Sequence, residues 1–98
     1  MSLDVLNRKL RDHIVRQDRK DDERAMRSGR YHNPHALALM LEAAERVESE
    51  SAGGTQEDWI RAVSRNFTVS RTMHTFLKKI DPAVDVDHGH WGWVWRKR

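Results

Sequence analysis

The residues best suited to contact a nucleic acid lie in segment 69–80, which the apolar spacing predicts to be a helix. Its polar face carries Arg71, Thr72, His74, Lys78 and Lys79. Cationic and hydroxyl groups of this kind hydrogen-bond to phosphate oxygens and base edges. Together with a preceding helix at 55–66, the segment has the proportions of a helix-turn-helix. An ordinary solvated helix face is the alternative.

The C-terminal segment 83–98 is rich in tryptophan and ends in cations. The aromatic positions are Trp91, Trp93 and Trp95, and the terminal cations are Arg96, Lys97 and Arg98. A period of two places the three indoles on one face of an extended strand. We predict that the terminal cations contact phosphates and that the indoles bind a partner protein, since tryptophan and arginine dominate protein-binding hot spots. Stacking on single-stranded bases, or packing over the core, stays open for the indoles.

A second interpretation is a protein-binding module. The far half of the first predicted helix is almost entirely charged and carries Arg16, Arg19, Arg24 and Arg27. With the tryptophan face, these arginines would anchor a protein partner. The apolar stripe Leu3, Leu6, Leu10 and Ile14 of the same helix could also pair with its copy in a homodimer.

Metal binding and catalysis have little support. His88 and His90 stand beside Asp85 and Asp87, and His32 stands near His35. Imidazole with carboxylate suits zinc, but the chain has no cysteine and lacks the spaced ligand pairs of zinc modules, so polar turns are the simpler interpretation. No nucleophile elbow, phosphate-binding glycine loop or HExxH motif is present. We expect no metal, no cofactor and no enzymatic activity.

The amino-acid composition and net charge limit which partners and which compartment the protein can have. The chain has 98 residues, of which 38% are hydrophobic and 34% charged, and its net charge of +3 permits nucleic-acid binding without requiring it. Four glutamates make segment 31–54 acidic between two basic segments. The absence of cysteine fits a reducing compartment, and no apolar run approaches the length of a membrane span. We therefore expect a cytoplasmic protein with no membrane partner.

The elements that position these residues are predicted to be four helices in a single domain, 1–98. A long charged helix occupies 1–29, between a cap at Ser2 and a stop at Gly29. The helical core is 33–80, with helices at 33–50, 55–66 and 69–80. Asn33-Pro34 is predicted to begin the second helix. Thr55 is predicted to cap the start of the third helix, where Asp58 completes a capping box. Asn66 is predicted to end the third helix in the left-handed conformation.

The predicted fold class is mainly α, a bundle of about four helices. Segment 36–47 is apolar nearly all round and is expected to be its buried centre. Segment 83–98 is the Trp-rich basic tail, expected as a short β-hairpin or an extended aromatic tail packed on the bundle.

One stretch of sequence resembles a pattern in small proteins of phages, plasmids and their bacterial hosts. The matching residues are the run Asn33-Pro34-His35-Ala36-Leu37-Ala38-Leu39-Met40-Leu41-Glu42-Ala43, then Phe67 and Phe76-Leu77-Lys78-Lys79. The resemblance implies no activity and no site. It implies a context in which small proteins regulate transcription or inhibit a host defence complex, as anti-CRISPR proteins do.

Overall fold

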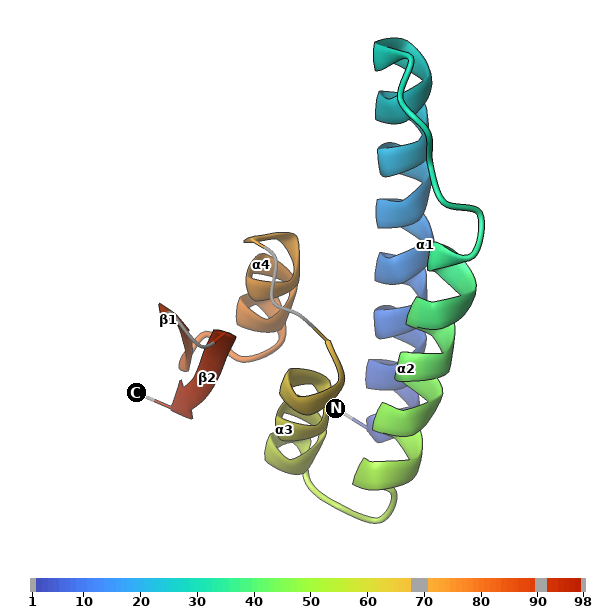
Figure 1. Cartoon of the computed structure of the whole chain (residues 1–98). Coiled ribbons are helices and arrows are strands. Elements are labelled where there is room, and N and C mark those ends of the chain that lie inside the picture. The colour runs from blue at the N-terminus through green and yellow to red at the C-terminus, as the bar shows by residue number, and fades with distance from the viewer. Residues whose placement is uncertain (1, 68–70, 90–91, 98) are drawn as a thin grey trace.

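The computed structural model describes residues 2–67, 71–89 and 92–97, and for residues 84–89 and 92–97 it describes the backbone only. Its elements, in chain order, are α1 (Leu3–Ser28), α2 (Ala36–Ser51), α3 (Gln56–Asn66), α4 (Arg71–Ile80), β1 (Val84–Gly89) and β2 (Gly92–Lys97). The described chain is thus mainly helical, as predicted. Figure 1 shows α1 and α2 side by side, α3 near the end of this pair, and α4 on the opposite side of α1 from most of α2.

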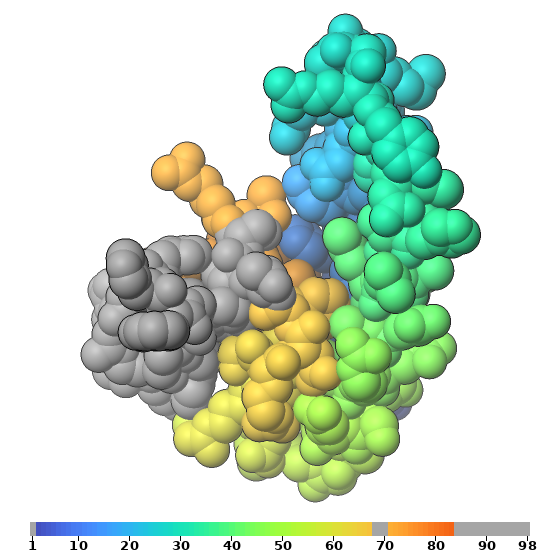
Figure 2. All heavy atoms as spheres, in the orientation of Figure 1, coloured from blue at the N-terminus to red at the C-terminus, as the bar shows by residue number. Residues whose placement is uncertain are grey.

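Helix α1 begins and ends where the sequence predicts. The Ser2 hydroxyl accepts a hydrogen bond from the Val5 N–H, and Gly29 adopts φ 67°, a left-handed conformation that costs glycine little. Its buried residues are Leu6, Asn7, Leu10 and Ile14, all in the first half. The second half and the following connection project from the body of the molecule (Figures 1 and 2). We call residues 17–35 the arm.

Helix α2 differs from its prediction at its start. The helix begins at Ala36 rather than at Pro34, because residues 34 and 35 form a turn. The Asn33 side chain caps this turn, not the helix: its Oδ1 accepts the N–H of His35 at 3.0 Å. An Asn-Pro pair favours a turn as readily as a helix start, and here the turn is formed.

The prediction that segment 36–47 is buried on several sides is wrong for its first half. Leu39 is 59% exposed, and the buried residues of α2 are Ala43, Ala44, Val47 and Ser51. The helix packs against α1 and α3 on one side, so its remaining surface meets solvent. Ala36 to Leu41 are therefore partly or largely exposed despite their apolar character.

The centre of the core lies on α3. Thr55 and Asp58 form the predicted capping box, and Trp59, Ile60 and Val63 are fully buried. The Trp59 indole N–H donates to Asn7 Oδ1 of α1 at 2.8 Å, so the one polar atom of this side chain is paired inside the core. All four helices contribute to the same apolar cluster.

The end of α3 also differs from its prediction. Asn66 is helical rather than left-handed, and Phe67 leaves the helix in an extended conformation with φ −125°. The Asn66 amide donates to the carbonyl of Ala62 and to Glu50 Oε2, each at 2.8 Å. These two bonds hold the side chain against α2 and α3, so no left-handed residue is needed to end the helix.

Helix α4 is the fourth helix of the core. Residues 68–70, which include the predicted start of α4 at Val69, lie outside the described residues. Within α4, Met73 and Leu77 are buried in the common core, as the predicted stripe requires.

Strands β1 and β2 pair antiparallel, with Val86 opposite Trp95 and Gly89 opposite Gly92. No helix among the described residues combines the length and apolar character needed to cross a membrane.

Candidate functional site

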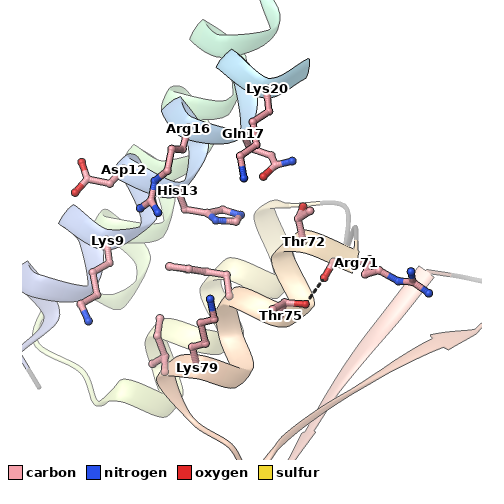
Figure 3. A pocket seen from close by; sticks show the side chains of 12 residues that line it. Lys9, Asp12, His13, Arg16, Gln17, Lys20, Arg71, Thr72, Thr75 and Lys79 are labelled. Atoms are coloured by element: carbon pink, nitrogen blue, oxygen red, sulfur yellow. Dashed lines mark hydrogen bonds between the residues drawn. The ribbon is translucent and has the colours of Figure 1, made fainter. Parts of the chain in front are cut away.

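A solvent-open groove of about 530 Å³ lies between α1 and α4. At its floor the ring of His13 from α1 stacks on the ring of Phe76 from α4, with centroids 4.6 Å apart and planes inclined by 21°. Behind the stack, Leu77 and Met73 tie α4 to the core. Figure 3 shows the two helices facing each other across this groove.

The groove is strongly cationic. Its charged lining consists of Lys9, Arg16 and Lys20 from α1, Arg71 and Lys79 from α4, and one carboxylate, Asp12. Arg16 and Lys79 extend toward His13 from the two helices, whereas Arg71 points away from α1 at the rim (Figure 3). None of these five cations forms an ion pair with a carboxylate in the part of the chain that the structure describes.

Helical periodicity explains why these cations share one surface. Lys9, His13, Arg16 and Lys20 follow the spacing i, i+4, i+7 and i+11, which is one stripe of a helix. At 1.5 Å per residue the stripe runs about 16 Å from Lys9 to Lys20. On α4, Thr72, Thr75 and Lys79 follow a matching stripe and line the opposite wall.

His13 lies among the cations of this surface, which together with burial disfavour its protonation. Burial is the first cause that lowers the pKa of His13 below its ordinary value of 6.5, and the positive charges of Arg16, Lys20 and Lys79 lower it further. A protonated His13 would add a fourth positive charge beside those of Arg16, Lys20 and Lys79 in a partly buried position. The neutral imidazole is therefore favoured.

The structure divides the residues predicted to bind nucleic acid into three groups. Arg71, Thr72 and Lys79 line the groove. Lys78 is exposed and His74 half-buried, and both lie outside its lining because they occupy another face of α4. The third group is Arg96, Lys97 and Arg98, whose side chains lie outside the described residues.

The residues predicted to bind a protein are likewise separated. Arg16 lines the groove beside residues that were assigned to nucleic acid. Arg19 and Arg27 are exposed on the arm, and Arg24 lies 3.9 Å from Asp21 there. The last group is Trp91, Trp93 and Trp95, whose side chains lie outside the described residues.

The structure adds Lys9, His13 and Lys20, which the sequence prediction missed. Their stripe is readable in the sequence, because four basic or imidazole side chains recur at helical spacing in 9–20. The sequence does not reveal that α4 lies against this stripe rather than against the charged residues next to it. Only the packing of Phe76 on His13 identifies the facing surface.

A second cavity, of about 600 Å³, adjoins the groove between α1, α2 and the start of α4. Figure 2 shows the surface hollowed between the α1–α2 pair and α4. Its lining is more apolar and includes Leu39, Met40 and Phe67. His13 lines both cavities and therefore stands on the wall between them.

Metal ligation has no support from the side chains that the structure describes, among which no group of three or more His, Asp or Glu is placed to hold an ion. His32 contacts Asp18 of the arm at 3.0 Å rather than pairing with His35. His90 and the side chain of His88 lie outside the described residues, so ligation by this pair remains untested.

The apolar stripe that was predicted to pair two copies of the chain has another use in the fold. Leu6, Leu10 and Ile14 are at most 2% exposed, because they pack against α2, α3 and α4 of the same chain. A homodimer through α1 stays a prediction, but it would have to use other residues of that helix.

No model of a known protein family matches the chain, and neither a curated protein nor a solved structure is detectably similar to it. The resemblance to proteins of phages and plasmids therefore stays a prediction, and the geometry of the groove is the basis for a functional proposal.

Proposed function

We propose that this chain is a non-enzymatic cytoplasmic protein, a small regulator of the kind encoded by mobile elements, that binds nucleic acid through phosphate contacts in the α1–α4 groove. One observation carries the proposal: five cations that form no ion pair with any carboxylate among the described side chains line a groove that holds a single carboxylate. The lining of charged and hydroxyl side chains suits a phosphate group, so binding is the function we propose for the groove.

The shape and chemistry of the groove fit one phosphodiester strand. Cations separated along about 16 Å of α1 can follow successive phosphates of a backbone. Lys79 adds a charge from the opposite wall, where the Thr75 hydroxyl donates to the Arg71 carbonyl at 3.0 Å. A single strand, or one strand of a duplex, could lie along this surface.

Salt dependence is the direct test, because each cation that neutralises a phosphate releases bound counterions. The probe is a fluorescent oligothymidylate about twelve nucleotides long, titrated from about 50 to about 300 mM salt. The triple variant Arg16→Gln, Lys20→Gln, Lys79→Gln should weaken binding and lower the slope of log affinity against log salt by about 2, at ~0.7 per lost contact.

The matched control removes the same charge elsewhere on the chain. The variant Arg8→Gln, Arg19→Gln, Arg27→Gln also loses three positive charges, all from exposed positions that do not line the groove. It should retain the slope of the original protein. Equal losses in both variants would mean that net charge, not the groove, attracts the strand.

The alternative is a protein-binding inhibitor or adaptor that uses the arm. The observation in its favour is that Met26 is 75% and Tyr31 84% exposed, an unusual setting for large apolar side chains on one projecting segment. In that case a variant confined to the arm, Met26→Ser with Tyr31→Ser, loses a protein partner and keeps the oligonucleotide, because neither residue lines the groove. This arm variant and the groove variant therefore discriminate between the two functions.

A further inference from the structure

We propose that the groove takes up a proton when it binds a phosphodiester, and that His13 is the group that receives it. This inference deepens the proposed function and rests on it. Its basis is a juxtaposition: an imidazole at the floor of the groove, between Arg16 and Lys20 of its own helix and Lys79 of α4.

Charged side chains line the groove and the adjoining cavity around His13. The groove is lined by Lys9, Asp12, Arg16 and Lys20 of α1 with Lys79 of α4, and at its rim by Arg71, which points away from α1. The adjoining cavity is lined by Asp21 and Arg24 of α1 with Arg46 of α2. Seven of these groups are cationic and two are carboxylates. Without a ligand, partial burial and then the charges of Arg16, Lys20 and Lys79 lower the pKa of His13, which favours the neutral imidazole.

A phosphodiester reverses the sign of that field. Seated among the cations, it places negative charge close to the imidazole, and an opposite charge within a few ångströms stabilises the protonated form. Nε2 and Nδ1 both carry a hydrogen in the imidazolium, so the ring becomes a donor on each side. The proton comes from solvent and joins the unprotonated ring nitrogen.

The stack on Phe76 survives the change of charge. The face of a phenyl ring attracts a cation, so an imidazolium keeps its place over Phe76. Protonation therefore needs no rearrangement of the floor of the groove. The ligand and the proton each favour the binding of the other, and the coupling is reciprocal.

The first experiment measures the proton directly. The pKa of His13 is determined by NMR titration of its ring signals in the intact chain, with and without saturating oligothymidylate, whose bases do not titrate in this range. The pKa should lie below the ordinary 6.5 in the free protein and above it in the complex. An oligonucleotide that binds without raising the pKa of His13 overturns this inference and leaves the proposed function standing.

The second experiment measures the consequence for affinity. Binding should tighten about tenfold between about pH 7.5 and about pH 5.5 for each unit by which the ligand raises the pKa. The variant His13→Gln should bind with little dependence on pH, and circular dichroism checks that it folds. The control His35→Gln, which changes an exposed histidine away from the groove, should keep the dependence.

The outcomes separate the two proposals. A pH dependence that persists in His13→Gln assigns the proton to another group and overturns the inference, although the groove still binds. If the original chain fails to bind the oligonucleotide throughout this pH range, the proposed function and the inference fail together.

Discussion

At the scale of single residues, the start of α3 is stabilised by hydrogen bonds between Thr55 and Asp58. Asp58 accepts from the Thr55 backbone N–H at 2.9 Å, and this bond, followed by the one from the Thr55 hydroxyl, lowers the pKa of Asp58 below its ordinary 3.8. The stabilisation is present above that value and is lost as the pH falls through the lowered pKa. Short-range caps of this kind are readable from the sequence, because both partners lie within three residues.

The pair formed by Asn7 and Trp59 is of the opposite kind, because 52 residues separate its members. Asn7 interrupts the apolar stripe of α1, four residues after Leu3 and three before Leu10, but the sequence does not show which distant group its side chain pairs with. In the structure it is 6% exposed, and its carbonyl oxygen accepts the Trp59 indole N–H. The sequence prediction recognised the apolar role of Trp59 but not its polar partner.

Replacing Asn7 with leucine tests this pair. The Trp59 N–H would be buried without an acceptor, so the free energy of unfolding should fall by about 1–3 kcal/mol. Urea unfolding monitored by tryptophan fluorescence and by circular dichroism measures the loss. In a Trp59→Phe background, where no N–H is left to satisfy, Asn7→Leu should cost less; an equal cost would show that the hydrogen bond is not the cause.

At the scale of the elements, α1 consists of two halves with different surroundings. The half up to Ile14 carries the buried residues, whereas the arm holds none that are fully buried among its described side chains. The contact between His32 and Asp18, at 3.0 Å, joins two residues of the arm itself. The first half is therefore held by the core and the second half by its own helical bonds.

This division predicts the pattern of amide hydrogen exchange. The amides of Leu10 to Ile14 should be protected close to the global free energy of unfolding, whereas those of Arg19 to Arg27 should exchange through local fraying. Mass spectrometry or NMR at low protein concentration measures both segments. Uniform protection of α1 would contradict the prediction and show that a partner, such as a second copy of the chain, covers the arm.

At the scale of the whole molecule, the groove exists only while α4 is docked on the core. Its two walls belong to helices that are about fifty residues apart in the chain, and Leu77, fully buried, holds the second wall in place. Folding of the core and assembly of the cationic surface are therefore one event.

The substitution Leu77→Ala tests this coupling. The lost packing and the cavity left behind should lower the free energy of unfolding by about 2–5 kcal/mol, a large share of the total of about 5–15 kcal/mol for a domain. Oligonucleotide binding should fall in proportion to the fraction of unfolded chain. Full affinity in a sample shown to be largely unfolded would place the binding residues outside the α1–α4 groove. Lys78→Ala, on an exposed position of the same helix, is the control.

The sequence by itself determined the features that depend on neighbours along the chain. The ends of α1, the capping box of α3, the apolar faces of α3 and α4 and the mainly helical class all follow from spacing and from short-range hydrogen bonds. Those interactions form within a few residues, so their partners are visible in the same stretch of sequence.

Only the tertiary structure decided which surfaces meet. It placed the centre of the core at Trp59 instead of in the first half of α2, left Leu39 exposed, and joined Arg16 of α1 with Lys79 of α4 around His13. An amphipathic helix shows which of its faces is apolar, but the choice of its neighbour depends on how the volumes of all four helices fill one core. The groove is a product of that packing, and no single segment of the sequence contains it.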